Sequence, residues 1–249
     1  MSFLPTFWWQ YSPPSALPNL QVWYNASDAT QFNKTTTTTN NTQVTSWQNF
    51  GTLTSHDWNS TGGKRPTFFT PVKNNLGAVR FSPAATSVLT INPIAYMQSL
   101  SGVTMAIVFR SNSTAAGTRI LSTTDTNGFR WGQNGTQWIG GFGGATYTVD
   151  SITADTNWHH VLIRFDGSQP TNTTKLQVRL DAVTNNLTFT GTVGSTTSAA
   201  ASTFYGGVDT GGNTNYWDGE IGELMFWTRP LNSGEINTVE QYITTKWNI

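Results

Sequence analysis

The sequence predicts an all-β protein, an antiparallel β-sandwich with a short C-terminal helix. Roughly a dozen short runs rich in apolar, β-branched and aromatic residues follow one another, separated by clusters of Gly, Asn, Asp and Ser at intervals of about 8 to 12 residues. A helical spacing of apolar residues follows the last run. The predicted strands are 20–24, 44–50, 78–81, 87–91, 105–110, 119–122, 128–132, 137–142, 146–149, 158–165, 176–180, 186–190, 202–206 and 220–227.

The last predicted strand, 220–227, has apolar residues on both alternating faces, as in a strand that is buried on both sides. Alternation puts two sets on opposite faces: Ile221, Met225 and Trp227, against Leu224 and Phe226. We therefore expect this strand to lie in the middle of a sheet that is covered on both faces.

The helix begins after a break at Pro230, which cannot donate to a β-ladder. Asn232 or Ser233 is a suitable N-cap. Spacings of three and four residues then place one apolar stripe along the helix, formed by Ile236, Val239, Tyr242, Ile243 and Trp247. This stripe predicts that the helix packs on a sheet.

We expect two parts in the chain: an N-terminal arm, 1–18, and a single sandwich domain, 19–249. The arm has four prolines, so its aromatic residues cannot lie on a regular helix. Exposed aromatic surface is unfavourable, so these rings pack either on the sandwich itself or on a partner subunit, in which case the arm is an assembly element. Its candidate residues are Phe3, Phe7, Trp8, Trp9 and Tyr11.

Composition argues against several classes of partner. The chain has 13 basic and 13 acidic residues, only 10% charged in all, so we expect no nucleic-acid binding. Cysteine is absent, which excludes disulfides and thiolate sites. No apolar run approaches the roughly 20 residues of a membrane span, so we expect no membrane insertion. The first residues also lack the pattern of a secretory signal.

Three stretches carry a resemblance to a known family. They are LQVWYNASDATQFN at 20–33, NWHHVLIRFDG at 157–167 and DGEIGELMFWTRPLNSGEINTVEQYITTKW at 218–247. Together they resemble the concanavalin A-like lectin/glucanase superfamily, in its laminin-G-like and pentraxin-like forms, from about residue 20 to the end. The resemblance implies a jelly roll of two antiparallel sheets, a fold that is also used in phage and other virion structural proteins.

Some members of the superfamily are glycoside hydrolases with an acidic motif on a strand. Retaining hydrolysis needs two carboxyl groups about 5 to 5.5 Å apart, hence on one face of a strand. Asp218 and Glu220 have the required even spacing, but Glu223 does not, and Gly222 stands where the hydrolase pattern has an Asp. We therefore assign no catalytic residue and expect a protein that is not an enzyme.

The adjacent histidines His159 and His160 invite a metal or general-base interpretation. Neighbouring residues on a strand point to opposite faces, so the pair cannot chelate one ion. In the family that this stretch resembles, a Trp-His-His sequence marks the fold, which favours a structural role.

Calcium is a candidate ion, because laminin-G-like and pentraxin-like domains often bind it at a rim. Asp and Asn oxygens suit this cation. The candidate ligands, in a Gly-rich loop before the last strand, are Asp209, Asn213, Asn215 and Asp218. Asp125 and Asn127 form a second, smaller group. A polar turn with no metal has the same composition.

Several aromatic residues lie in or beside Gly-rich loops, where flat rings can stack on sugars or form a protein interface. The candidate surface consists of Trp131, Trp138, Tyr147, Tyr205, Tyr216 and Trp217. Core packing is the alternative, which we expect for at least half of them.

Three functions remain open. The first is a non-catalytic structural module of a virus particle, as a capsid decoration, fibre or tail component of a bacteriophage; the others are a carbohydrate-binding module for cell-surface glycan and a glycoside hydrolase. For the first, we expect partners among other virion subunits or copies of this chain, with a trimer as one order known for fibres. The module would lie on the virion surface after assembly in the host cytoplasm, or otherwise be extracellular.

Overall fold

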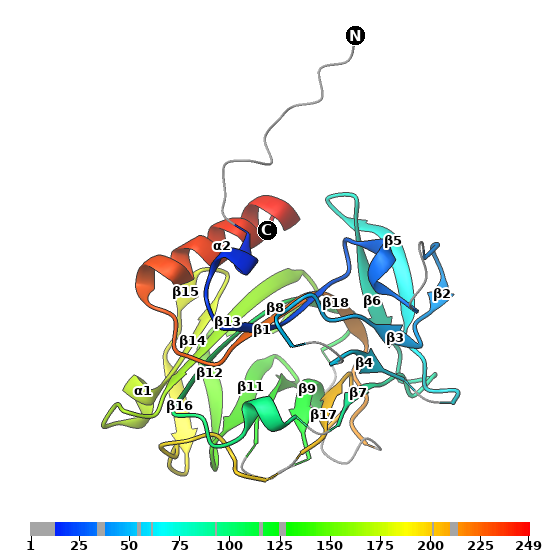
Figure 1. Ribbon diagram of the computed structural model, residues 1–249. Helices are drawn as coiled ribbons and strands as arrows, with labels where there is room; N and C mark the ends of the chain where they lie inside the picture. Colours follow the sequence, from blue (N-terminus) through cyan, green and yellow to red (C-terminus); the bar gives the residue numbers. More distant parts are fainter. Residues whose placement is uncertain are drawn as a thin grey trace.

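The computed structural model describes residues 13–33, 38–53, 56–60, 62–92, 94–114, 117–124, 128–200, 202–209 and 214–249. Over these residues the protein forms two nine-stranded antiparallel sheets that pack face to face, with one long helix on the outside of the first sheet (Figure 1). The predicted fold class is confirmed: an antiparallel β-sandwich of two sheets with a C-terminal helix.

Sheet A lies next to the helix. Its order is β15 (Val183–Thr184), β14 (Leu176–Leu180), β13 (Trp158–Asp166), β8 (Gly102–Ser111), β18 (Gly219–Trp227), β6 (Leu76–Phe81), β5 (Thr67–Lys73) and β2 (Thr42–Gln43). Strand β1 (Leu20–Asn25) also pairs with β18, beyond the point where β6 ends its pairing. The last strand of the chain thus lies in the centre of the sheet, as the sequence predicts.

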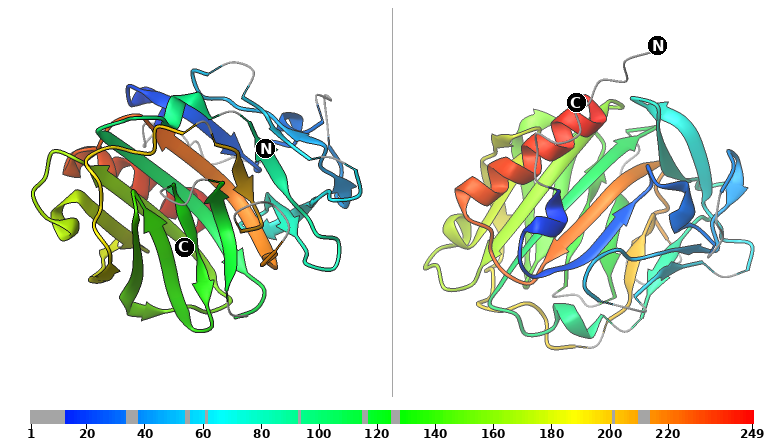
Figure 2. Two further views of the ribbon diagram at one scale, coloured as in Figure 1. Left: turned by 90° about the horizontal axis from the view of Figure 1, so that it is seen from below. Right: turned by 45° about the horizontal axis from the view of Figure 1, so that its top comes forward.

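Sheet B forms the opposite layer, which lies in front in the left view of Figure 2. Its order is β16 (Leu187–Thr190), β12 (Ala145–Thr153), β11 (Gln137–Phe142), β10 (Arg130–Asn134), β9 (Thr118–Thr123), β17 (Phe204–Gly206), β7 (Leu89–Ile91), β4 (Trp58–Asn59) and β3 (Ser46–Trp47). Short helical turns join the strands at η2 (Pro14–Ala16), η3 (Ala29–Gln31), η4 (Ala95–Met97) and α1 (Asn172–Lys175).

The main core lies between the two sheets and is rich in aromatic side chains. Tyr24 stacks on Trp58 with ring centroids 5.3 Å apart, and Trp58 stacks in turn on Phe204 at 5.6 Å. All three rings are buried. Large rings supply much of the buried apolar surface per residue, so this stack joins β1 of sheet A to β4 and β17 of sheet B.

A β-bulge at Gly222 changes the faces of the last strand. In the pairing of β18 with β8, the register shifts between Ile221 and Glu223. The extra residue turns Ile221 to the core between the sheets, together with Leu224 and Phe226. Met225 and Trp227 face the helix, as strict alternation from Glu223 onward requires. The sequence-based placement of Ile221 beside Met225 and Trp227 is therefore wrong.

Helix α2 (Ser233–Trp247) covers the outer face of sheet A (Figure 1 and Figure 2, right). Asn232 is the N-cap: its side chain accepts from the Glu235 backbone N–H, and the Glu235 carboxylate accepts from the Asn232 N–H. This capping box satisfies two backbone donors at the helix start. The predicted stripe faces the sheet, with Ile236, Val239, Ile243 and Trp247 buried and Tyr242 partly buried.

The N-terminal arm is described only from Pro13. Here η2 lies against α2, Leu17 packs into the cluster beneath the helix, and Arg229 Nε donates to the Pro18 carbonyl. The end of the predicted arm thus packs on this chain. Its candidate assembly residues, Phe3, Phe7, Trp8, Trp9 and Tyr11, lie outside the described residues.

Candidate binding site

The carboxylate of Glu220 is held in a buried ion-pair network. Arg80 Nε donates to it at 2.7 Å, and an Arg110 guanidinium nitrogen lies 2.6 Å from its other oxygen. The Glu220 side chain is fully buried. Asp218, the partner suggested by spacing, accepts instead from the Asn112 amide at 3.0 Å.

Glu223 has four donors beneath helix α2. Lys246 Nζ lies 3.0 Å away, Trp23 Nε1 2.6 Å, Trp247 Nε1 2.9 Å and the Tyr242 hydroxyl 2.8 Å. Burial, with the charge and hydrogen bond of Glu223, raises the pKa of Tyr242, so its hydroxyl remains a donor. The cluster connects β1, β18 and α2.

The bulge places Glu220 and Glu223 on the same outer face of sheet A, contrary to the parity expected from sequence. Both carboxylates are fully buried and bonded to cations or polar hydrogens of the chain. Their oxygens are therefore committed to joining neighbouring strands and the helix. A glycoside hydrolase needs one carboxyl group that gives up a proton and one that attacks or activates water, both open to substrate.

The two histidines lie on opposite faces of β13, as expected. His159 is bonded on both ring nitrogens, to Asp181 at 2.7 Å and to Asp155 at 2.8 Å. Burial, the largest influence, lowers the pKa of His159, but the bonds and charges of Asp181 and Asp155 together raise it above 6.5. His160 is buried on the helix side, where desolvation lowers its pKa.

The candidate calcium loop does not gather free oxygen ligands in its described part. Asn215 turns its amide nitrogen to Asp209 at 3.2 Å, and Asp209 also lies 3.8 Å from Arg119. Asn213 lies outside the described residues, as do Asp125 and Asn127 of the second candidate group, and Asp218 is bonded to Asn112. Among the described residues no group of three or more His, Asp or Glu is placed to hold a metal ion.

Four of the six candidate rings are core residues. Trp131 stacks on Trp138 at 5.8 Å between the sheets, and Tyr147 and Trp217 are also buried. Trp217 donates to the Ser111 hydroxyl at 2.9 Å. The glycines beside these rings make room for them, since a Cβ at Gly140 would lie 2.2 Å from the Tyr147 ring. A stacking surface formed by these four residues is therefore wrong.

The remaining two rings are half-buried. Tyr216 lies beside Lys64, whose ammonium is 3.3 Å from the tyrosine hydroxyl. Tyr205 is in β17 of sheet B, directly opposite Ser122, and Ser122 is directly opposite Arg130 on the next strand. Residues opposite one another share a face of the sheet, so Tyr205 and Arg130 belong to one cross-strand row.

A groove of about 220 Å³ lies on the outer face of sheet B. We name it the sheet B groove; it is lined by Arg119, Arg130, Ile139, Gly140, Thr146, Tyr147, Thr148, Thr188 and Thr190. Alternation produces this lining, because Thr146 and Thr148 of β12 and Thr188 and Thr190 of β16 occupy alternate positions that face outward. Of these residues only Tyr147 is selected by the sequence analysis, although the two Thr-x-Thr repeats are visible in the sequence.

The groove carries positive charge. Arg119 is only 16% exposed and has Asp209 as its carboxylate neighbour. Burial has the largest effect on the pKa of Arg119 and lowers it. The negative charge of Asp209 raises this pKa, and the positive charge of Arg130 lowers it further. No hydrogen bond or ion pair joins the Arg130 guanidinium to another described residue, and its Nε is buried.

Hydroxyl groups form the other side of the groove. Thr148 and Thr188 donate to the Asp150 carboxylate at 3.1 and 2.8 Å. Thr146 and Thr190 are exposed and directly opposite each other across β12 and β16. The groove thus combines guanidinium donors, hydroxyl groups and the apolar side chain of Ile139, the chemistry by which proteins hold polyhydroxylated ligands.

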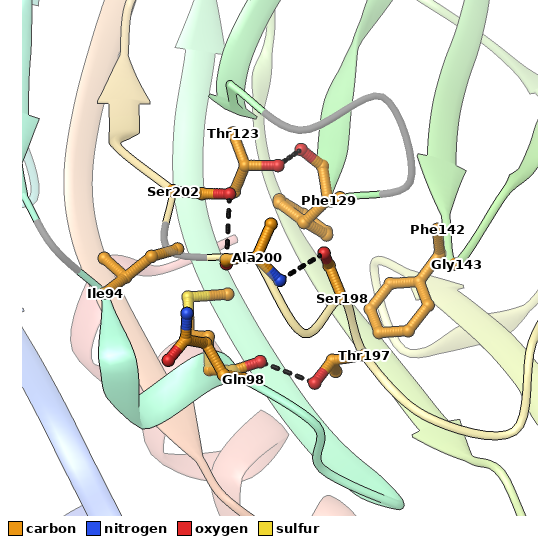
Figure 3. A pocket seen from close by; sticks show the side chains of 12 residues that line it. Ile94, Gln98, Thr123, Phe129, Phe142, Gly143, Thr197, Ser198, Ala200 and Ser202 are labelled. Atoms are coloured by element: carbon orange, nitrogen blue, oxygen red, sulfur yellow. Dashed lines mark hydrogen bonds between the residues drawn. The ribbon is translucent and has the colours of Figure 1, made fainter.

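Other hollows are less suited to a ligand. The cavity in Figure 3 encloses about 30 Å³, little more than a water molecule, and its polar groups bond to one another, as from Thr123 to the Phe129 carbonyl. A wider groove beside α2 contains two arginines, but Arg164 pairs with Asp166 and Arg179 with Glu240.

Comparison with known proteins identifies the family. A family model described as the concanavalin A-like lectin/glucanases superfamily matches residues 83–237, more than half of the chain. The chain belongs to this superfamily. No curated protein matches the sequence. None of the described helices has the length and apolar character to cross a bilayer.

Several solved structures share the fold at low identity. The binding domain of botulinum neurotoxin DC in complex with SialylT is 11% identical, with a TM-score of 0.52, over 81% of this chain and 51% of the toxin chain. A second structure concerns botulinum neurotoxin type C, whose cell entry depends on interaction with two ganglioside molecules. It is 12% identical, with a TM-score of 0.53, over 81% of this chain and 51% of the toxin chain.

A sialidase is also similar. The Trypanosoma rangeli enzyme in complex with 2,3-difluorosialic acid is 14% identical, with a TM-score of 0.55, over 90% of this chain and 33% of the sialidase. This chain therefore spans about half the length of the toxin domains and a third of the enzyme. At these identities the likeness shows the fold alone.

Proposed function

We propose that this protein is a non-catalytic interaction module that binds glycan in the sheet B groove. The observation that carries the proposal is the lining of that groove, where Arg119 and Arg130 face the threonine hydroxyls of β12 and β16 across the apolar Ile139. Sugars present hydroxyl groups at their edges and C–H groups on their faces, and this lining can contact both.

The related structures support the same class of ligand. Two of the toxin structures concern a sialylated compound and gangliosides, and the sialidase was solved with a sialic acid derivative. These ligands belong to those proteins. The shared fold makes a glycan a reasonable first class to test with this chain.

The arrangement of carboxylates favours binding over hydrolysis. Glu220 and Glu223 lie on the outer face of sheet A, in buried ion pairs, whereas the groove lies on sheet B. Two carboxylates contact lining residues of the groove: Asp209 adjoins Arg119, and Asp150 accepts from two threonines. We therefore propose no catalytic role for this chain.

Display on a bacteriophage or other virus particle is part of the proposal. It rests on the charge-poor, cysteine-free composition and on the aromatic residues 1–12, which suit docking to other virion subunits or to copies of this chain. Mass spectrometry of particles purified from the source, with immunogold labelling, tests the location. Absence of the chain from purified particles would remove the virion role and leave an extracellular glycan-binding role.

A glycan array tests the binding function. Full-length protein is compared with Thr146→Trp, which fills the sheet B groove from an exposed position, and with Gln177→Trp, which places the same ring at an exposed position of strand β14 in sheet A. We expect the first substitution to abolish binding and the second to leave it intact. Loss of glycan binding in Gln177→Trp alone would place the site on sheet A. If the full-length protein bound no glycan on the array, the proposal would be refuted.

A further inference from the structure

We infer that the ligand of the sheet B groove is an acidic glycan, and that Arg130 binds the carboxylate of a sialic or uronic acid residue in it. This inference rests on the glycan-binding function proposed above. It starts from the charges on the face of sheet B and from the register of four neighbouring strands.

Five arginines have a close carboxylate counter-ion, whereas Arg130 in the groove and Arg65 outside it have none among the described residues. Arg80, Arg110, Arg164, Arg179 and Arg229 each lie within 3.1 Å of a carboxylate oxygen. No carboxylate of the described residues forms an ion pair with Arg130, and its buried Nε has no hydrogen-bond partner. A buried donor without a partner is unfavourable, and a ligand oxygen would satisfy it.

The neighbouring charge strengthens this preference for an anion. Arg119 is close enough to Arg130 for their like charges to repel, and its own carboxylate neighbour, Asp209, is 3.8 Å away, beyond hydrogen-bond distance. Asp150, at the threonine side, already accepts two hydroxyl protons. The arginine side of the groove therefore has an excess of positive charge that an acidic ligand would neutralise.

The sheet leaves space beside Arg130 for a sugar ring. Directly opposite Arg130 on β11 is Gly141, which has no side chain to cover the guanidinium. Gly141 is in turn opposite Thr146, and Thr146 is opposite Thr190. Two strand spacings, about 10 Å, separate Arg130 from Thr146. This distance suits a sugar whose carboxylate contacts Arg130 while its hydroxyl groups reach the threonines.

A carboxylate suits this position because its two oxygens match the fork of donors on a guanidinium. A sulfate ester offers the same charge in a tetrahedral form, and a neutral sugar offers none. The inference therefore distinguishes three kinds of glycan: carboxylated, sulfated and neutral.

The test uses the full chain on an array that carries matched sets: lactose, 3′-sialyllactose, 3′-sulfolactose, and neutral and uronic acid oligosaccharides. We expect carboxylated members to be bound and their neutral counterparts to bind at least about 10-fold more weakly, as loss of a charge-assisted pair implies. Binding of neutral or sulfated glycans alone would overturn the inference but leave the proposed function. Binding of none would overturn both.

The role of Arg130 is then measured by titration with 3′-sialyllactose, or with the carboxylated oligosaccharide that the array selects. We expect Arg130→Gln to lose most of the preference for the acidic ligand, and Arg65→Gln, which removes one charge outside the groove, to keep it. An equal loss of affinity in both variants would overturn the assignment to Arg130. Unfolding curves of both variants verify that each is folded.

Discussion

The Lys246 ammonium lies 3.0 Å from the Glu223 carboxylate, beneath the helix that both residues help to anchor. Glu223 is fully buried and Lys246 nearly so. Glu223 follows the bulge at Gly222, which turns it to the helix side of sheet A. One extra residue in a strand thus decides where the C-terminal helix is attached.

Removal of one partner of this pair should destabilise the protein strongly. In Lys246→Met the carboxylate of Glu223 remains buried without its cation, and we expect a loss of about 3 to 5 kcal/mol in the free energy of unfolding in urea. The double variant Lys246→Met/Glu223→Gln should lose less than Lys246→Met alone. Lys73→Met, at a half-buried lysine, is the control. Equal losses in Lys246→Met and Lys73→Met would contradict the structure.

The bulge glycine should tolerate no side chain. A Cβ at Gly222 would lie 2.3 Å from the Trp247 ring, so Gly222→Ala must displace the helix, at a cost of about 1 to 3 kcal/mol. Gly141→Ala is the matched control, because its nearest atom would be 3.4 Å away. Thermal unfolding compares the two variants. A similar melting temperature for both would show that the helix does not pack on Gly222 as described.

The histidine pair predicts a dependence of stability on pH in two directions. The folded pKa of His159 is raised, so its contribution is complete below pH 6.5 and is lost as pH rises through that higher pKa. The folded pKa of His160 is lowered, so its contribution is complete above pH 6.5 and is lost as pH falls. Stability should therefore decline on both sides of pH 6.5.

Urea unfolding of His159→Gln and His160→Gln across this range separates the two effects. We expect His159→Gln to remove the decline above pH 6.5, and His160→Gln to remove the decline below it. If His159→Gln instead changed the stability only below pH 6.5, the hydrogen bonds to Asp181 and Asp155 would not stabilise the protonated ring as inferred.

The N-terminal residues predict a change in assembly. A chain that starts at Pro13 keeps the contacts of Leu17 and Pro18 with the helix layer but lacks the aromatic residues of 1–12. We expect it to be a folded monomer and the intact chain to be an oligomer, as measured by size-exclusion chromatography with light scattering. The same number of chains per molecule in both samples would exclude these residues as an oligomerisation element.

Much of the fold could be predicted from the sequence, because alternation and turn residues are local signals. The predictions that β18 is buried on both faces and that α2 packs through one apolar stripe are both correct. The position of Ile221 was wrong because a bulge shifts the alternation, and only pairing with β8 reveals it. Trp131 and Trp138 were candidates for a surface because their neighbouring glycines suggested loops, whereas these glycines lie in paired strands.

The sheet B groove could be predicted only in part. Thr146 and Thr148 alternate visibly in the sequence, but Arg119 and Arg130 meet only through the register of β9 with β10. That register contains a bulge beside Trp131, which local patterns do not indicate. Net charge was also uninformative, since a neutral chain can still place an unpaired arginine in a groove.

The most direct test of the account is a crystal structure of the full chain with a glycan selected on the array. We predict density for the sugar on the outer face of sheet B, with its carboxylate on Arg130 and its hydroxyl groups near Thr146. A glycan bound to sheet A, beside α2 or in the cavity of Figure 3, would contradict the assignment of the groove.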